Sequence, residues 1–166
     1  MKNLRPLIAK RVKGREQELT KLCCKLIQAG GENPPGDVSE VANIIEHFLE
    51  DEGILHERFE PVEGHANILA TVGKGKPTLI LCGHIDVVPA GNPKQWIVHP
   101  YSGEIREGKI LGRGATDMKG GIAAMLMAAA ILEDFEDDFS GKAVFASVCD
   151  EEAMGLAGAS WLLENR

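Results

Sequence analysis

Three short segments of the chain carry side chains that could bind a metal ion and support hydrolysis. His84 and Asp86 form a His-x-Asp pair directly after an apolar run, which we interpret as a buried strand. In an extended backbone, residues i and i+2 point to the same face, so Asp86 can hold the imidazole of His84. A carboxylate beside an imidazole is typical of a metal-bound histidine, because it fixes the tautomer and raises the basicity of the ligand.

The other two segments supply carboxylates. Asp117 lies in a glycine-rich segment just before a predicted helix, where Asp is commonly an N-cap that still leaves one oxygen free. Asp150, Glu151 and Glu152 follow another apolar run, and they could simply favour the positive end of a helix dipole. Three acids in this place are nevertheless costly unless a cation is near. Of two adjacent carboxylates, one can bind a metal while its neighbour serves as the base of metal-assisted hydrolysis.

The spacing of apolar residues predicts the elements that position these groups. It predicts helices at residues 19–27, 38–49, 118–133 and 156–164, and strands at residues 54–60, 67–72, 78–82, 109–111 and 143–149. This order predicts an α/β fold, a three-layer αβα sandwich with a mixed, mostly parallel sheet. His84 and the acidic triplet follow strands directly, and the carboxyl ends of strands are where open α/β sheets place ligands.

Composition narrows the class of protein. The 166 residues are 44% hydrophobic and 26% charged, which is enough for one soluble domain with a core. The net charge of -7 argues against nucleic acid or an anionic membrane as the main partner, and we expect no membrane-spanning segment. The four cysteines lie in apolar segments, so we predict buried, reduced thiols in a cytoplasmic protein. They are Cys23, Cys24, Cys82 and Cys149.

The same motifs resemble a known family. Residues 83–89 (GHIDVVP), 112–121 (GRGATDMKGG) and 150–152 (DEE) resemble the acetylornithine deacetylase, succinyl-diaminopimelate desuccinylase and aminoacylase family of dinuclear zinc hydrolases. The turn at residues 34–36 (PPG) and Trp96 with the Pro-Tyr pair at residues 100–101 also fit this family. The similarity covers roughly residues 15–166.

The resemblance implies a role for each candidate residue. It implies that His84 binds one zinc ion, that Glu152 binds a second, and that Asp117 bridges both. Glu151 is then the general base, and Asp86 orients His84. Cobalt or manganese could substitute for zinc. The resemblance also implies a cis peptide bond after Asp117.

The resemblance implies hydrolysis of the amide bond of an N-acyl amino acid, either acetyl or succinyl. A metallo-dipeptidase or carboxypeptidase with the same site stays open, as does a truncated chain without activity. The expected partners are a small N-acyl amino acid or peptide as substrate and further copies of the same protein in a homo-oligomer.

The chain ends inside a periodic helix, and members of the family continue beyond this point. They add another acidic ligand, an inserted lid and dimerisation domain, and a late histidine ligand. We therefore predict that residues 1–166 are the N-terminal part of a zinc-hydrolase catalytic domain, with the lid domain and the C-terminal part absent. Three protein ligands are too few for two zinc ions that want about four each, so the isolated chain is predicted to be inactive.

Overall fold

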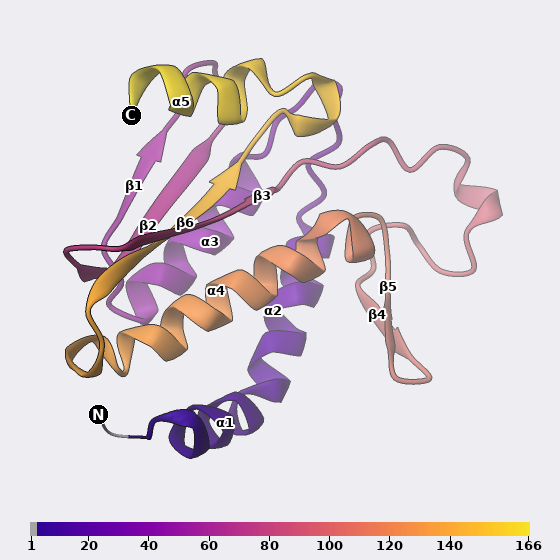
Figure 1. Ribbon diagram of the computed structural model, residues 1–166. Helices are drawn as coiled ribbons and strands as arrows, with labels where there is room; N and C mark the ends of the chain where they lie inside the picture. Colours follow the sequence, from indigo (N-terminus) through magenta and orange to yellow (C-terminus); the bar gives the residue numbers. More distant parts are fainter. Residues whose placement is uncertain (1–2) are drawn as a thin grey trace.

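The computed structural model describes residues 3–166, in which helices cover both faces of a central sheet (Figure 1). On one face lie α2 (Glu16–Gln28), α3 (Ser39–Asp51) and α4 (Gly120–Glu133), with α1 (Arg5–Gly14) leading into α2. On the opposite face lies α5 (Trp161–Asn165). The predicted three-layer αβα arrangement is therefore confirmed.

The central sheet has four strands in the order β1-β2-β6-β3. Their bounds are β1 (His56–Phe59), β2 (Asn67–Lys74), β3 (Thr78–His84) and β6 (Gly141–Val148). The pairs β1–β2 and β2–β6 are antiparallel, and β3–β6 is parallel. The sheet is mixed, as predicted, but antiparallel pairing predominates among the described strands. Only β3 and β6 are joined by a crossover helix, α4, which is the connection that a parallel pair needs.

The remaining elements surround this sheet. A separate hairpin is formed by β4 (Glu104–Arg106) and β5 (Lys109–Leu111). Short turns of 3-10 or π helix occur at Pro93–Gln95, Ala115–Lys119, Glu136–Asp138, Glu151–Ala153 and Leu156–Ser160. The predicted helices and strands are all present, with bounds that differ by a few residues. Neither α1 nor β4 was predicted.

The main core lies between the sheet and α2, α3 and α4. Helix α4 is apolar on nearly every side because it packs against both the sheet and the other two helices. By length and composition, the segment Ala115–Glu133 could cross a membrane, which our sequence prediction did not foresee. Here it is the core helix of the domain, with Ile122, Ala123 and Leu126 buried in the main cluster.

The second face of the sheet is only partly covered. Helix α5 contributes Leu162 and Trp161 to a small cluster with Phe59, Ala146 and Val148. The edge strand β3 stays uncovered, and its Leu79 and Ile80 are 56% and 64% exposed. This edge position also exposes Cys82, so the prediction that all cysteines are buried was wrong. Cys24 is half-buried, and the other two cysteines are buried as predicted.

Candidate metal and catalytic site

The candidate site begins at the last residue of β3, His84, which pairs with Val148 at the end of β6. Its ring is buried. Nδ1 lies 3.0 Å from the backbone oxygen of Asp86 and 3.5 Å from the carboxylate oxygen Oδ1 of the same residue. Nε2 points the other way and lies 3.0 Å from Oδ1 of Asp117. One ring nitrogen is therefore fixed by Asp86, and the other faces the acidic residues.

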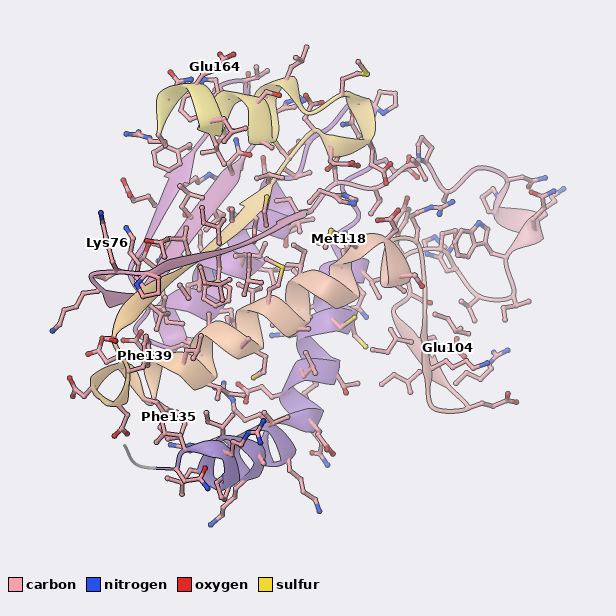
Figure 2. The ribbon with its side chains drawn as sticks, in the orientation of Figure 1. Lys76, Glu104, Met118, Phe135, Phe139 and Glu164 are labelled. Carbon is pink, nitrogen blue, oxygen red and sulfur yellow. The ribbon has the colours of Figure 1, made fainter. Side chains whose placement is uncertain are left out.

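Asp117 lies in the π-helical turn Ala115–Lys119 that leads into α4. The turn begins at Gly114, where φ is +80° and a Cβ would lie 2.5 Å from Cγ1 of Val87, so only glycine fits. Figure 2 shows Met118 just before α4, and its side chain lies beside Gly83 near the end of β3. The peptide bond between Asp117 and Met118 is cis, which confirms the prediction.

The acidic triplet forms a tight turn directly after β6. Asp150 has a left-handed backbone with φ of +63°, and its carbonyl accepts hydrogen bonds from the backbone N–H groups of Ala153 and Gly155. At Gly158 a Cβ would lie 1.9 Å from the backbone oxygen of Cys149, so the chain can return this closely only with glycine. This fold-back directs the acidic pair Glu151–Glu152 toward the end of β3.

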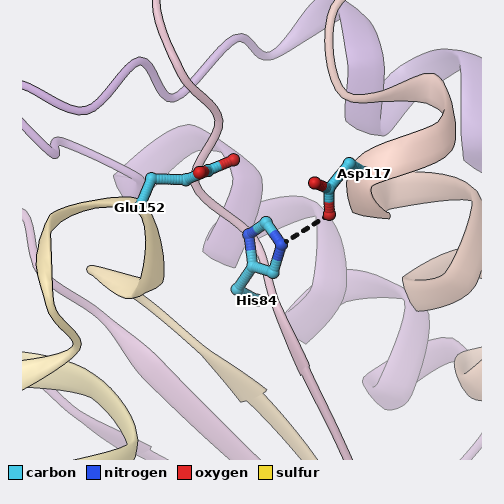
Figure 3. Close-up of side chains that lie close together, drawn as sticks. All are labelled: His84, Asp117 and Glu152. Carbon is cyan, nitrogen blue, oxygen red and sulfur yellow. Dashed lines mark hydrogen bonds and ion pairs between the residues drawn. The ribbon is translucent and has the colours of Figure 1, made fainter.

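The three segments converge at one point. Ligand atoms of His84, Asp117 and Glu152 all lie within 4.8 Å of one another (Figure 3). Oε2 of Glu151 lies 3.9 Å from Nε2 of His84, so this carboxylate faces the same point. The structure thus brings together the residues that the sequence predicted as metal ligands and base, with Asp86 directly behind His84.

The carboxylate of Asp86 is fully buried and accepts several hydrogen bonds. Its donors are the side-chain amide of Asn33 at 2.9 Å and the backbone N–H groups of Glu151 at 3.2 Å and Glu152 at 3.1 Å. Burial raises the pKa of Asp86, but the hydrogen bonds from His84, Asn33 and the two backbone amides outweigh it and lower the pKa overall. Asp86 therefore carries a negative charge that these donors stabilise.

The hydrogen bond to Asp86 also raises the pKa of His84 to about 9, against the opposing effect of burial and with help from Asp117. In the described part of the chain, His84 is the only basic side chain within ion-pair distance of the clustered carboxylates. The site therefore has an excess of negative charge. An imidazole nitrogen with several carboxylate oxygens is a donor set that suits zinc, and also cobalt or manganese. The residues present fit a divalent cation.

Sequence reasoning missed one polar residue of this region, Asn33. The sequence indicated only the turn at residues 34–36 that follows Asn33. The side chain of Asn33 contacts Asp86 at 2.9 Å and also Asp150 at 3.2 Å. These partners are 53 and 117 positions away along the chain, so no local pattern could have predicted the contacts.

An α/β fold that gathers an imidazole and carboxylates at the ends of strands can support metal-dependent hydrolysis. Comparison with known families supports this chemistry, because residues 80–166 match the model of the family described as peptidase family M20/M25/M40. This match covers more than half of the chain. The protein belongs to this family of hydrolases, and the resemblance found in the sequence is confirmed.

Relatives and solved structures support the assignment. A succinyl-diaminopimelate desuccinylase of Methylorubrum extorquens (strain PA1) is 46% identical over 99 residues, which are 59% of this chain and 26% of that protein. An M20 family metallo-carboxypeptidase from Sulfolobus solfataricus is 26% identical with a TM-score of 0.72, over 81% of this chain and 31% of that one. Human carnosine dipeptidase 1 shares the fold, with 24% identity and a TM-score of 0.77 over 98% of this chain and 38% of that one. The chain spans about a quarter of the length of the curated relatives that it matches.

Proposed function

We propose that the full-length protein is a zinc-dependent amidohydrolase that cleaves N-acyl amino acids, with N-succinyl amino acids as the first candidates. The convergence of His84, Asp117 and Glu152, with Glu151 facing the same point, is the observation that carries this proposal. The succinyl group is favoured because relatives 44–46% identical to this chain are named succinyl-diaminopimelate desuccinylases.

In this proposal, the ligands are divided as the family resemblance implies. His84 and Glu152 would each hold one zinc ion, and Asp117 would hold both. Zinc in such a site polarises the amide carbonyl and lowers the pKa of the attacking water. Further ligands would come from segments of the full-length protein that correspond to the parts of the relatives that this chain does not span. The same donors accept cobalt or manganese, so the choice of metal is part of the proposal.

Glu151 is the proposed general base. Its side chain is 58% exposed, so it can reach a substrate, while its backbone N–H is held by Asp86. It would accept a proton from the water whose oxygen attacks the carbonyl carbon. It would then give this proton to the amine nitrogen as the C–N bond breaks, which leaves a free carboxylic acid and a free amino acid.

A metallo-carboxypeptidase or dipeptidase is the second candidate. The metallo-carboxypeptidase from Sulfolobus solfataricus is 26% identical to this chain over 81% of this chain's residues, which favours this alternative. The chemistry of the residues would be the same, with a peptide bond in place of the acyl amide.

A substrate panel separates the two candidates. The full-length protein, loaded with zinc, would be assayed against N-succinyl and N-acetyl amino acids and against unmodified dipeptides. We expect kcat/KM to be highest for an N-succinyl amino acid. Faster cleavage of dipeptides would favour the second candidate, and no hydrolysis of any substrate by zinc-loaded protein would contradict both.

A cytoplasmic location and self-association into a homo-oligomer are further proposals. Light scattering of the full-length protein tests the second one.

A further inference from the structure

Beneath the candidate site, two buried carboxylates share a single amide group. The side chain of Asn33 is almost fully buried, with 5% of the residue exposed. Its Nδ2 lies 2.9 Å from Oδ2 of Asp86 and 3.2 Å from Oδ1 of Asp150. Asp86 is fully buried and Asp150 is 9% exposed, so little solvent screens the two acids.

An amide is well suited to this place. Two carboxylates that lie side by side in a buried environment repel each other unless donors lie between them. The NH2 group of Asn33 has two hydrogens, and it can give one to each carboxylate without adding a charge. Without it, Asp86 and Asp150 would each lose a donor and would face each other directly.

The backbone holds Asn33 firmly in this position. Its N–H donates to the backbone oxygen of Val87 at 2.8 Å, and the N–H of Val87 donates in turn to Gly31 at 2.9 Å. Glu32 and Val87 form an isolated parallel bridge. The segment that contains Asn33 is therefore attached to Val87, the residue that directly follows Asp86.

Each of the two carboxylates fixes a different part of the site. Asp86 holds the ring of His84 and the backbone amides of the acidic pair Glu151–Glu152. Asp150 accepts a second hydrogen bond from the backbone N–H of Ala157 at 3.1 Å, which closes the turn that carries this pair. Asn33 thus links the end of β3 to the turn after β6.

We propose that Asn33 is a positioning residue, which sets the placement of the acidic pair Glu151–Glu152 relative to His84 by binding Asp86 and Asp150 at once. Its importance for catalysis rests on the proposed function, but the structural link does not. Asn33 touches neither the ligand atoms nor the base. It acts through Asp86 and Asp150.

The test compares two variants of Asn33 with a matched control. Asn33→Ala removes both donors, and Asn33→Asp keeps the shape but adds a negative charge. The control is Ile45→Val, because Ile45 is also fully buried but lies in α3, in the main core cluster rather than in the turn after β6. Two properties would be measured. One is amide hydrogen exchange at Glu151 and Glu152 in zinc-free protein, relative to core amides of β2, and the other is zinc affinity by competition with a chelator.

In Asn33→Ala, we expect the amides of Glu151 and Glu152 to exchange at least about 10-fold faster relative to the core, and zinc affinity to fall about 10-fold. In Ile45→Val, both quantities should stay within about threefold of the wild type, although overall stability falls. Asn33→Asp distinguishes positioning from simple charge. An added carboxylate alone would strengthen zinc binding, whereas loss of positioning weakens it, and we expect weaker binding.

Unchanged relative exchange at Glu151 and Glu152 in both Asn33 variants would overturn the proposal, as would tighter zinc binding by Asn33→Asp. If Asn33→Ala does not fold, the isosteric Asn33→Asp decides the question. If the full-length wild-type protein binds no zinc, the proposed function is wrong, and hydrogen exchange in zinc-free protein still decides the role of Asn33.

Discussion

Removal of the Asp86 carboxylate should destabilise the domain even without any metal. The substitution Asp86→Ala leaves three donors without their acceptor, namely the Asn33 amide and the backbone N–H groups of Glu151 and Glu152. Each buried donor that loses its partner costs about 1–3 kcal/mol. Release of the repulsion between Asp86 and Asp150 offsets part of this cost, so we expect the unfolding free energy to fall by about 3 kcal/mol. For a domain of this size, this corresponds to a fall in Tm of roughly 6–12 °C.

The assay is urea unfolding of zinc-free protein at pH 7, followed by tryptophan fluorescence. Zinc must be absent, because a bound ligand would add its own stabilisation to the wild type. Asp134→Ala is the control, since Asp134 is a partly exposed carboxylate that pairs with Arg11 at 3.0 Å and should contribute less than about 1 kcal/mol. If Asp86→Ala loses no more unfolding free energy than this control, the hydrogen bonds of Asp86 do not hold the site together.

Two further predictions concern the surroundings of the site. The Tyr101 hydroxyl donates a hydrogen bond to Glu32, and this bond is the largest cause that lowers the pKa of the Glu32 carboxyl. The bond therefore stabilises the fold above the ordinary carboxyl pKa of 4.5, and this stabilisation is lost as pH falls through the lowered pKa. Tyr101→Phe should therefore lower the unfolding free energy by about 1.5–3 kcal/mol at pH 7 and by clearly less at about pH 3. An equal loss at both pH values would show that the Tyr101 hydrogen bond does not lower the pKa of Glu32. Gly158→Ala should lower the unfolding free energy by at least about 1–3 kcal/mol, because the added Cβ would lie 1.9 Å from the backbone oxygen of Cys149. An unchanged Tm in thermal unfolding would show that the turn moves to accept the methyl group.

Local patterns in the sequence predicted most elements that position the site. The apolar run before His84 and the one before the acidic triplet indicated the two strands that form the parallel pair, β3 and β6. The apolar helix between them indicated the crossover. Because both strands were predicted to end beside polar residues, the sequence also predicted that these residues would meet.

What the sequence could not predict depends on contacts between distant segments. Helix α1 has no buried residue, so its sequence lacks the apolar stripe that reveals an amphipathic helix. The antiparallel pairing of β2 with β6 joins segments about 70 residues apart, and nothing local specifies it. The exposure of Cys82 follows from the edge position of β3, which an apolar run does not reveal. The role of Asn33 depends on the tertiary fold in the same way.

The central claim is that Glu152 holds metal while its neighbour Glu151 moves the proton. The most direct test compares zinc content and turnover of Glu151→Gln and Glu152→Gln in the full-length protein, with an N-succinyl amino acid as substrate. We expect Glu151→Gln to retain nearly all of its zinc and to lose turnover by about 10²–10⁴-fold, as expected for loss of a general base. Glu152→Gln should lose zinc. Equal zinc loss in both variants, or zinc loss in Glu151→Gln alone, would contradict this division of roles.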